Sequence, residues 1–133
     1  MREFYKDFDE TSFNLGVIDC FCEMVAAGVK GLALSHPMTE EEYKRIGGLS
    51  DRIAGKYSVK SFLEKNLIET DLSPADLMEN HWVILYYKDS GVLEDYFALK
   101  SKAEGLRKEG HYMESKRREI TESFRRLLGY PAK

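Results

Sequence analysis

Two cysteines separated by one residue, Cys20 and Cys22, are the first residues whose type and spacing suggest chemistry. Cysteine thiolates bind zinc and take part in redox reactions, and His36 follows further along the chain. However, apolar residues at helical spacing surround both cysteines, and side chains two residues apart on a helix point about 200° apart. The thiols therefore cannot share a metal ion on an intact helix, so we expect structural cysteines and no metal site.

Two carboxylates on the same predicted helix, Asp19 and Glu23, lie one turn apart, where burial could raise a pKa and allow acid–base catalysis. Lys30 follows on the same side of the helix, and a solvent-facing edge explains all three residues more simply. The chain has no Ser-His-Asp motif, phosphate-binding loop, zinc-binding helix or dinucleotide fingerprint. The sequence therefore identifies no catalytic residue and no cofactor, and it leaves enzymatic activity uncertain.

A second candidate site follows the apolar run at residues 82–87. Ligands often bind where a strand ends and a helix begins, because the first N–H groups of a helix are free to bind them. This arrangement predicts a candidate ligand pocket at His81, Tyr87, Asp89 and Ser90. Capping of the next helix by Asp89 or Ser90 explains the same polar residues without a ligand.

The strongest compositional feature is the basic end of the chain, since residues 98–133 contain ten Lys or Arg against five Glu. Two predicted helices around a turn carry these charges, and such a face could neutralise the phosphates of a nucleic acid. The candidate phosphate contacts are Lys116, Arg117, Arg118, Arg125 and Arg126. Glutamates one turn away from several of them favour a solvated surface, or docking against the acidic half, over nucleic-acid binding.

The elements that must position these residues follow from apolar spacing and capping residues. Ser12 and Ser73 are expected to cap helices, Thr39 and Glu42 to form a capping box, and Phe13 to lie on the apolar side of the first helix. The pattern predicts helices at residues 12–30, 40–57, 74–80, 92–109 and 113–128. It predicts a short strand within 56–63, an extended segment at 67–72, a strand at 82–87 and a connector at 32–38. Apolar side chains along the whole of 82–87 indicate a strand that is covered on both faces, in the middle of a small sheet.

These elements predict a helix-rich α+β fold, with a central sheet of two or three strands and a C-terminal helical hairpin. A length of 133 residues, 43% of them hydrophobic, fits a single globular domain over residues 1–133. No apolar run approaches the roughly 20 residues of a membrane span, and residues 1–10 are too charged for a signal peptide. Two cysteines too close for an ordinary disulfide agree with a reducing compartment, so we expect a cytoplasmic protein without membrane contact.

The segments NLIETDL at 66–72, WVILYYK at 82–88 and RLLGYP at 126–131 resemble a prokaryotic, largely archaeal, family of uncharacterised proteins. They cover a small part of the chain, and none of them is a catalytic signature. The resemblance implies a small cytoplasmic protein with no assigned activity. It assigns a role to no residue.

Two classes of function remain after these exclusions. Abundant aromatic residues and the lack of a catalytic motif favour a non-enzymatic interaction or regulatory module, with self-association as one form of interaction. The alternative is a small-molecule-binding protein or enzyme with a pocket at the end of the strand 82–88, or nucleic-acid binding through the basic hairpin. The sequence identifies neither a ligand nor a partner.

Overall fold

A computed structural model describes residues 9–131 of the chain, and these residues form five helices and three strands. In chain order they are α1 (Glu10–Ala26), β1 (Leu32–Leu34), α2 (Glu40–Lys56), β2 (Lys60–Glu64), α3 (Ala75–Met78), β3 (Val83–Tyr87), α4 (Ser90–Lys108) and α5 (Glu114–Leu127). The expected helix-rich α+β fold, its small sheet and its C-terminal helical hairpin are confirmed.

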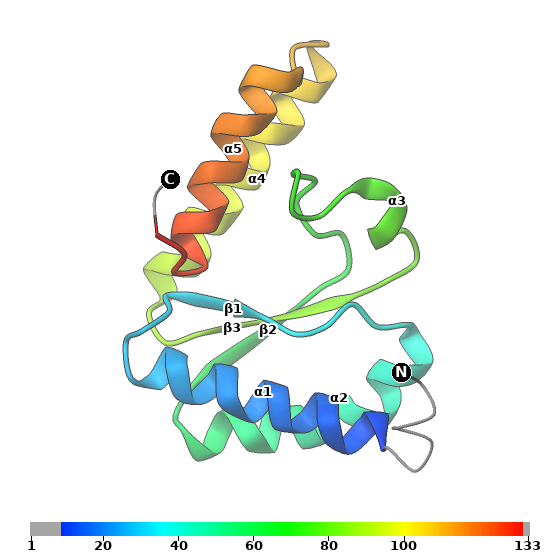
Figure 1. Ribbon diagram of the computed structural model, residues 1–133, viewed down its shortest axis with the longest axis vertical. Helices are drawn as coiled ribbons and strands as arrows, with labels where there is room; N and C mark the ends of the chain where they lie inside the picture. Colours follow the sequence, from blue (N-terminus) through cyan, green and yellow to red (C-terminus); the bar gives the residue numbers. More distant parts are fainter. Residues whose placement is uncertain (1–8, 132–133) are drawn as a thin grey trace.

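The sheet lies between two helical layers (Figure 1). Its strand order is β1-β3-β2, and β3 pairs antiparallel with both neighbours. Helices α1 and α2 cover one face, whereas the α4–α5 hairpin stands over the other face and leans away from it toward its turn. The segment between β2 and β3, which contains α3, lies beside the hairpin on that second face. The sheet therefore separates two hydrophobic clusters.

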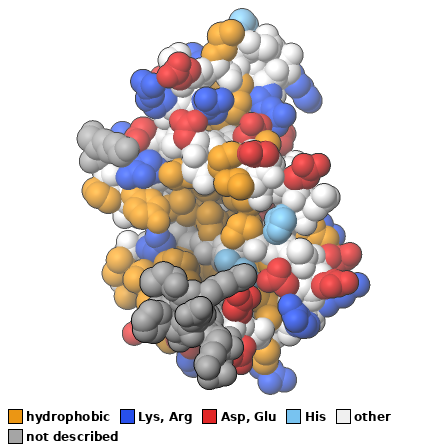
Figure 2. Space-filling view, turned by 45° about the vertical axis from the view of Figure 1, so that its right-hand side comes forward, with side chains coloured by type: hydrophobic (Ala, Val, Ile, Leu, Met, Phe, Trp, Pro, Cys, Tyr) orange, Lys and Arg blue, Asp and Glu red, His pale blue; other side chains and the backbone are white. Residues whose placement is uncertain are grey.

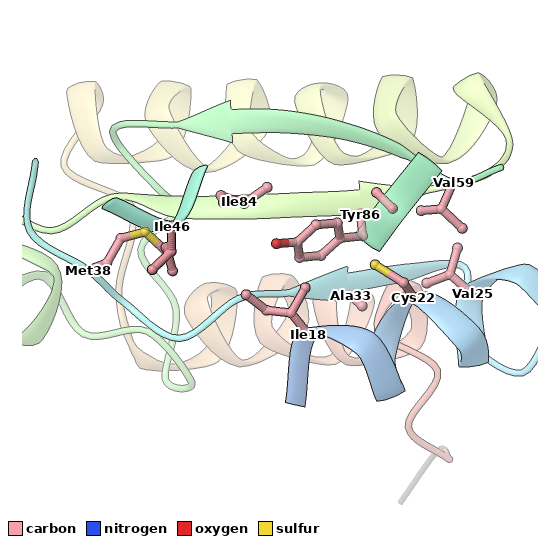
Figure 3. Close-up of a cluster of buried hydrophobic side chains, with 10 residues drawn as sticks. Ile18, Cys22, Val25, Ala33, Met38, Ile46, Val59, Ile84 and Tyr86 are labelled. Atoms are coloured by element: carbon pink, nitrogen blue, oxygen red, sulfur yellow. The ribbon is translucent and has the colours of Figure 1, made fainter. Parts of the chain in front are cut away.

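The central strand β3 supplies side chains to both clusters, as its continuous apolar sequence predicts. Ile84 and Tyr86 belong to the cluster under α1 and α2, where Figure 3 shows side chains of α1 pointing toward Tyr86. The Tyr86 hydroxyl is 2.5 Å from the hydroxyl of Ser50, so the buried phenol has a hydrogen-bond partner. Val83 and Leu85 belong to the other cluster, together with residues of α4 and α5. The predicted two-sided burial is confirmed.

Helix α1 differs from its prediction at both ends and in its buried side. It begins at Glu10, because Asp9 rather than Ser12 caps it by accepting hydrogen bonds from two backbone N–H groups, and it ends at Ala26. Phe13, predicted to face inward, is 54% exposed. The buried residues of the helix are Ile18, Cys22 and Val25. Because this helix carries apolar residues on most of its sides, its sequence alone does not indicate which side packs against the sheet.

The connector predicted at 32–38 is wrong in its first half, because Leu32–Leu34 forms the edge strand β1. Leu32 lies opposite Tyr87 and Leu34 opposite Leu85. This strand therefore forms by pairing with β3, which is far away in the sequence. A three-residue segment carries too short a pattern to predict a strand by itself. The capping box at the start of α2, formed by Thr39 and Glu42, is confirmed.

The extended segment predicted at 67–72 is an irregular loop, with one isolated bridge between Thr70 and Ser73. Ser73 does not cap α3: the residue at the N-cap is Pro74, and no side chain caps this helix. Instead, the Ser73 hydroxyl donates a 2.6 Å hydrogen bond to the carbonyl of Ile68. Because this hydroxyl closes the loop on itself, it is not available to the helix.

Candidate ligand-binding groove

An apolar groove opens between the C-terminal end of α5, the sheet and the loop that precedes α3. Its volume is about 480 Å³. We call it the C-terminal groove; its lining residues are Leu34, Ser35, Pro37, Leu67, Leu72, Ser73, Met78, Val83, Phe124, Arg125, Leu128 and Tyr130. Figure 2 shows hydrophobic side chains gathered around a hollow in the middle of this face. Several lining residues also belong to the hydrophobic cluster between the sheet and the α4–α5 hairpin, so the groove extends that cluster to the surface.

The end of α5 brings Tyr130 to the groove through a tight turn at Gly129. Gly129 has a φ of +86°, a backbone conformation that residues with a side chain rarely adopt. A Cβ at this position would also lie 3.2 Å from the carbonyl oxygen of Val29. Glycine therefore allows the C-terminal segment to pack against the turn after α1 and to place Tyr130 beside α5.

The two serines that line the groove are already hydrogen-bonded. The Ser35 hydroxyl donates to the carbonyl of His36 at 3.0 Å and accepts from the N–H of Ile84 at 2.9 Å. The Ser73 hydroxyl donates to the carbonyl of Ile68, as described above. Neither hydroxyl has a side-chain base beside it among the interactions of residues 9–131.

Arg125 is the charged side chain of the groove lining, and its hydrogen-bonding capacity is largely unused. Its Nε is buried and has no hydrogen-bond partner within the described chain. The nearest carboxylate oxygen, in Glu122, lies 3.7 Å from Nε, beyond the roughly 2.7–2.9 Å of a charge-assisted hydrogen bond. We treat this pair as a loose ion pair, so Arg125 retains donors for another acceptor.

A second cation strengthens the positive charge at this end of the groove. The Arg125 guanidinium lies 5.2 Å from the ring centre of Tyr130, and Nζ of Lys30 lies 4.8 Å from the same centre. Lys30 also donates a hydrogen bond to the carbonyl of Leu128, and burial lowers the pKa of its amino group. The aromatic ring at the rim of the groove therefore has two basic side chains beside it.

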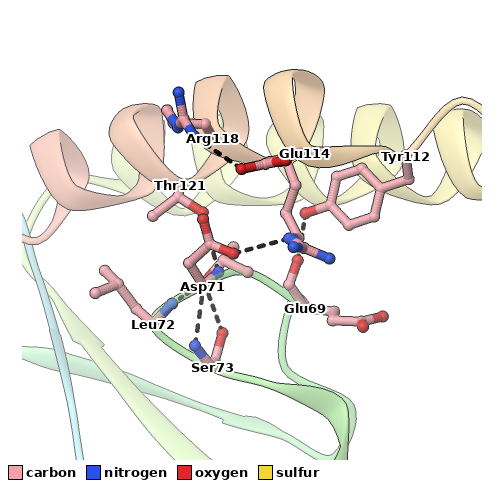
Figure 4. A network of polar contacts seen from close by, with 10 residues as sticks. Glu69, Asp71, Leu72, Ser73, Tyr112, Glu114, Arg118 and Thr121 are labelled. Atoms are coloured by element: carbon pink, nitrogen blue, oxygen red, sulfur yellow. Dashed lines mark hydrogen bonds and ion pairs between the residues drawn. The ribbon is translucent and has the colours of Figure 1, made fainter.

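Polar contacts fix the wall of the groove formed by residues 69–73 to the hairpin (Figure 4). The Tyr112 hydroxyl donates to the carbonyl of Glu69, and the Arg117 Nε donates to a carboxylate oxygen of Asp71 at 2.8 Å. The backbone N–H of Asp71 donates to the Thr121 hydroxyl at 3.0 Å. These contacts hold the loop, whose residues Leu72 and Ser73 line the groove, against the hairpin.

Among these contacts, we expect the part-buried hydrogen bond to Thr121 to stabilise the protein more than the exposed ion pair. Thr121 is 7% exposed, and Thr121→Val should lower the free energy of unfolding by about 1–2 kcal/mol, because the N–H of Asp71 loses its acceptor. The side chains of Arg117 and Asp71 are 41% and 47% exposed, so Arg117→Ala should cost at most about 0.5 kcal/mol. Urea unfolding of both variants measures the difference, and a larger cost for Arg117→Ala would contradict this ranking.

The structure pairs four of the five candidate phosphate contacts with carboxylates. Lys116, Arg118 and Arg125 lie within 4 Å of glutamates of α5 itself, at Glu119, Glu114 and Glu122. Arg117 instead pairs with Asp71 of the neighbouring loop. Arg126 is exposed on another side of the hairpin, next to Lys102 and Arg118. The three pairs within α5 agree with a solvated helix surface, whereas Arg117–Asp71 agrees with docking against the acidic half of the chain. Nucleic-acid binding stays a prediction.

The four residues of the candidate pocket around β3 lie at the two ends of that strand. His81 precedes β3, and its Nδ1 lies 2.7 Å from the carbonyl oxygen of Glu79. Tyr87 ends the strand, Asp89 caps α4 by accepting from the N–H of Gly91, and the Ser90 hydroxyl accepts from Lys60. A five-residue strand rises about 16 Å, so the structure brings Tyr87, Asp89 and Ser90 together but leaves His81 apart. The C-terminal groove begins at Val83, near the His81 end.

Sequence reasoning did not identify the C-terminal groove. It named Arg125 only as a phosphate contact, and it assigned Leu34 and Pro37 to a connector. The one local signal was the Gly129-Tyr130-Pro131 ending, which predicts a turn but not what the turn packs against.

The two cysteines occupy different environments, as helical spacing predicts: Cys20 is exposed and Cys22 is buried. Burial raises the pKa of the Cys22 thiol to about 11. Among residues 9–131, no three His, Cys, Asp or Glu side chains form a group that could hold a metal ion. The expected absence of bound zinc or iron stays a prediction for elemental analysis.

We expect the two thiols to react with a thiol reagent at very different rates. At about pH 8, Cys20 should react fast in the native protein, whereas Cys22 should react at least about 100-fold more slowly, because it is both shielded and protonated. Kinetics with an aromatic disulfide reagent would show one fast thiol per chain and a second only after unfolding. Cys20→Ser serves as the control and should abolish the fast phase. Two equally fast thiols would contradict the buried position of Cys22.

The fold and the groove define a helix-rich α+β protein with an apolar groove that carries an arginine. No helix in the described part of the chain has the length and apolar character needed to cross a bilayer. Comparisons with protein-family models, with curated proteins and with solved structures found no match for this chain. The geometry of the groove is therefore the observation from which a function can be argued.

Proposed function

We propose that this protein binds a small apolar molecule in its C-terminal groove. The observation that carries the proposal is the groove itself, with a volume of about 480 Å³ and a mainly apolar lining. Small-molecule sites in proteins are concave, have volumes of about 300–1,000 Å³ and combine apolar walls with a few polar groups. The groove meets each of these criteria.

The groove favours the small-molecule alternative over a general interaction module. A stable protein–protein interface buries about 800 Å² on each partner, whereas this groove is concave and is lined by twelve residues. Its walls come from a fixed loop, a sheet and a helix end, so the site exists before the ligand binds. A cytoplasmic location is part of the proposal, and the two unpaired thiols support it.

The experiment that tests the proposal is a titration with 1-octanol, a neutral apolar probe, followed by methyl NMR of the full chain. The methyl groups of Leu34, Val83 and Leu128 should shift in a saturable way, with a dissociation constant below about 1 mM, because an eight-carbon chain buries enough apolar area to offset the cost of binding. Leu49 and Ile53, on α2 beyond the sheet, are the internal controls and should not shift. Absence of saturable shifts, or equal shifts at the control residues, would refute the proposal.

A further inference from the structure

The charge at one end of the C-terminal groove indicates the chemical class of its ligand. The groove is apolar along most of its length, but Arg125 stands at its Tyr130 end with its buried Nε unpartnered by any hydrogen bond within residues 9–131. Lys30 lies beside the same aromatic ring and makes no ion pair in the described part of the chain. The Arg125 side chain is 20% exposed and makes no hydrogen bond within residues 9–131, so a ligand that supplies an acceptor to its terminal N–H groups gains affinity there.

We infer that the ligand is a small amphipathic monocarboxylate, with its apolar chain among Leu34, Val83 and Leu128 and its carboxylate on Arg125. This inference rests on the proposed function and deepens it. The planar guanidinium of arginine offers several N–H donors in a fork that matches the two oxygens of a carboxylate. The apolar part requires no further polar partner, because Ser35 and Ser73 are already hydrogen-bonded.

The same residues favour a single negative charge over a phosphate or a second carboxylate. Glu122 lies 3.7 Å from the Arg125 Nε, so it partly offsets the positive charge and would repel a dianion. Arg125 is also the one charged residue of the groove lining, whereas phosphate sites usually combine several donors. Arg125 and Lys30 carry two positive charges and Glu122 one negative charge, so this end of the apolar groove has a net charge of about +1 and fits one carboxylate attached to a hydrophobic chain.

The test compares octanoate with 1-octanol, which has the same chain length and no charge, on the full chain at neutral pH. The wild-type protein should bind octanoate at least tenfold more tightly than 1-octanol. Arg125→Gln should remove this preference and leave the affinity for 1-octanol within about threefold, which also shows that the groove is intact. Arg126→Gln removes the neighbouring, exposed arginine and should retain the tenfold preference.

Each other outcome has a definite meaning. If 1-octanol shifts the groove methyls but octanoate binds no more tightly, the carboxylate assignment is wrong and the proposed function stands. If neither compound binds, both are wrong. A preference for octanoate that survives Arg125→Gln, or that Arg126→Gln removes equally, would mean that the carboxylate does not lie on Arg125 and would overturn the inference. If Arg125→Gln lowers the affinity for octanoate and for 1-octanol equally, the arginine has a structural role, and this result would also overturn the inference.

Discussion

Replacing Glu64 with alanine is expected to lower the free energy of unfolding by about 3 kcal/mol. This glutamate is 5% exposed at the end of β2, and one of its carboxylate oxygens accepts hydrogen bonds from Tyr96 at 2.7 Å and from Lys100 at 2.9 Å. The other oxygen accepts from the backbone N–H of Asn66 at 3.2 Å. One side chain thus joins β2, the following loop and α4.

The cost is large because Glu64 and its partner Tyr96 are buried, and its partner Lys100 is mostly shielded from water. Tyr96 is fully buried, and its hydroxyl also accepts from the N–H of Ile68, so the phenol links the loop to the carboxylate. Burial, followed by the hydrogen bond to Glu64, raises the pKa of the phenol, so it stays protonated and able to donate. Without the carboxylate, the phenol and the 18% exposed Lys100 lose their acceptor in a largely dry site.

Urea unfolding measures the effect, and Glu119→Ala is the control. Glu119 also pairs with a lysine, Lys116, but its side chain is 64% exposed, so its loss should change stability by less than about 0.5 kcal/mol. Lys100→Met should couple with Glu64→Ala by at least about 1 kcal/mol in a double-mutant cycle, because both changes remove the same ion pair. A cost below about 1 kcal/mol for Glu64→Ala would mean that the cluster does not hold β2 and α4 together.

Phe124→Ala should destabilise the protein by about 4 kcal/mol, the other large effect that we expect. Phe124 is fully buried in the cluster between the sheet and the hairpin, and its ring centre lies 6.1 Å from that of Tyr96. Its removal deletes a large apolar side chain and leaves a cavity that the helix α5 and the sheet can only partly close.

Thermal and urea unfolding would measure the stability of Phe124→Ala, with Met113→Ala, at the start of α5, as the control variant. Met113 is 69% exposed, so its replacement should change stability by less than about 0.5 kcal/mol. A similar, small loss for both variants would show that the hairpin does not depend on Phe124 to pack on the sheet.

Local patterns in the sequence were sufficient for the elements whose signal is contained in a few neighbouring residues. The continuous apolar run at 82–87 predicted the central strand, and the Thr39 and Glu42 capping box predicted the start of α2. The two helices of the C-terminal hairpin followed from their apolar spacing and from Gly110 between them. These features are predictable because helix period, strand period and capping depend on residues at most a few positions apart.

Tertiary contacts decided the features on which function depends. Leu32–Leu34 is a strand only because β3 lies beside it, and residues 67–72 remain a loop because their hydrogen bonds go to one another and to the hairpin. The sequence by itself determined that Arg125 lies on a basic helix near a turn. Only the folded chain places it between Glu122 and Tyr130, at the end of an apolar groove. A groove arises from side chains that distant segments bring together, and no local pattern records which segments will meet.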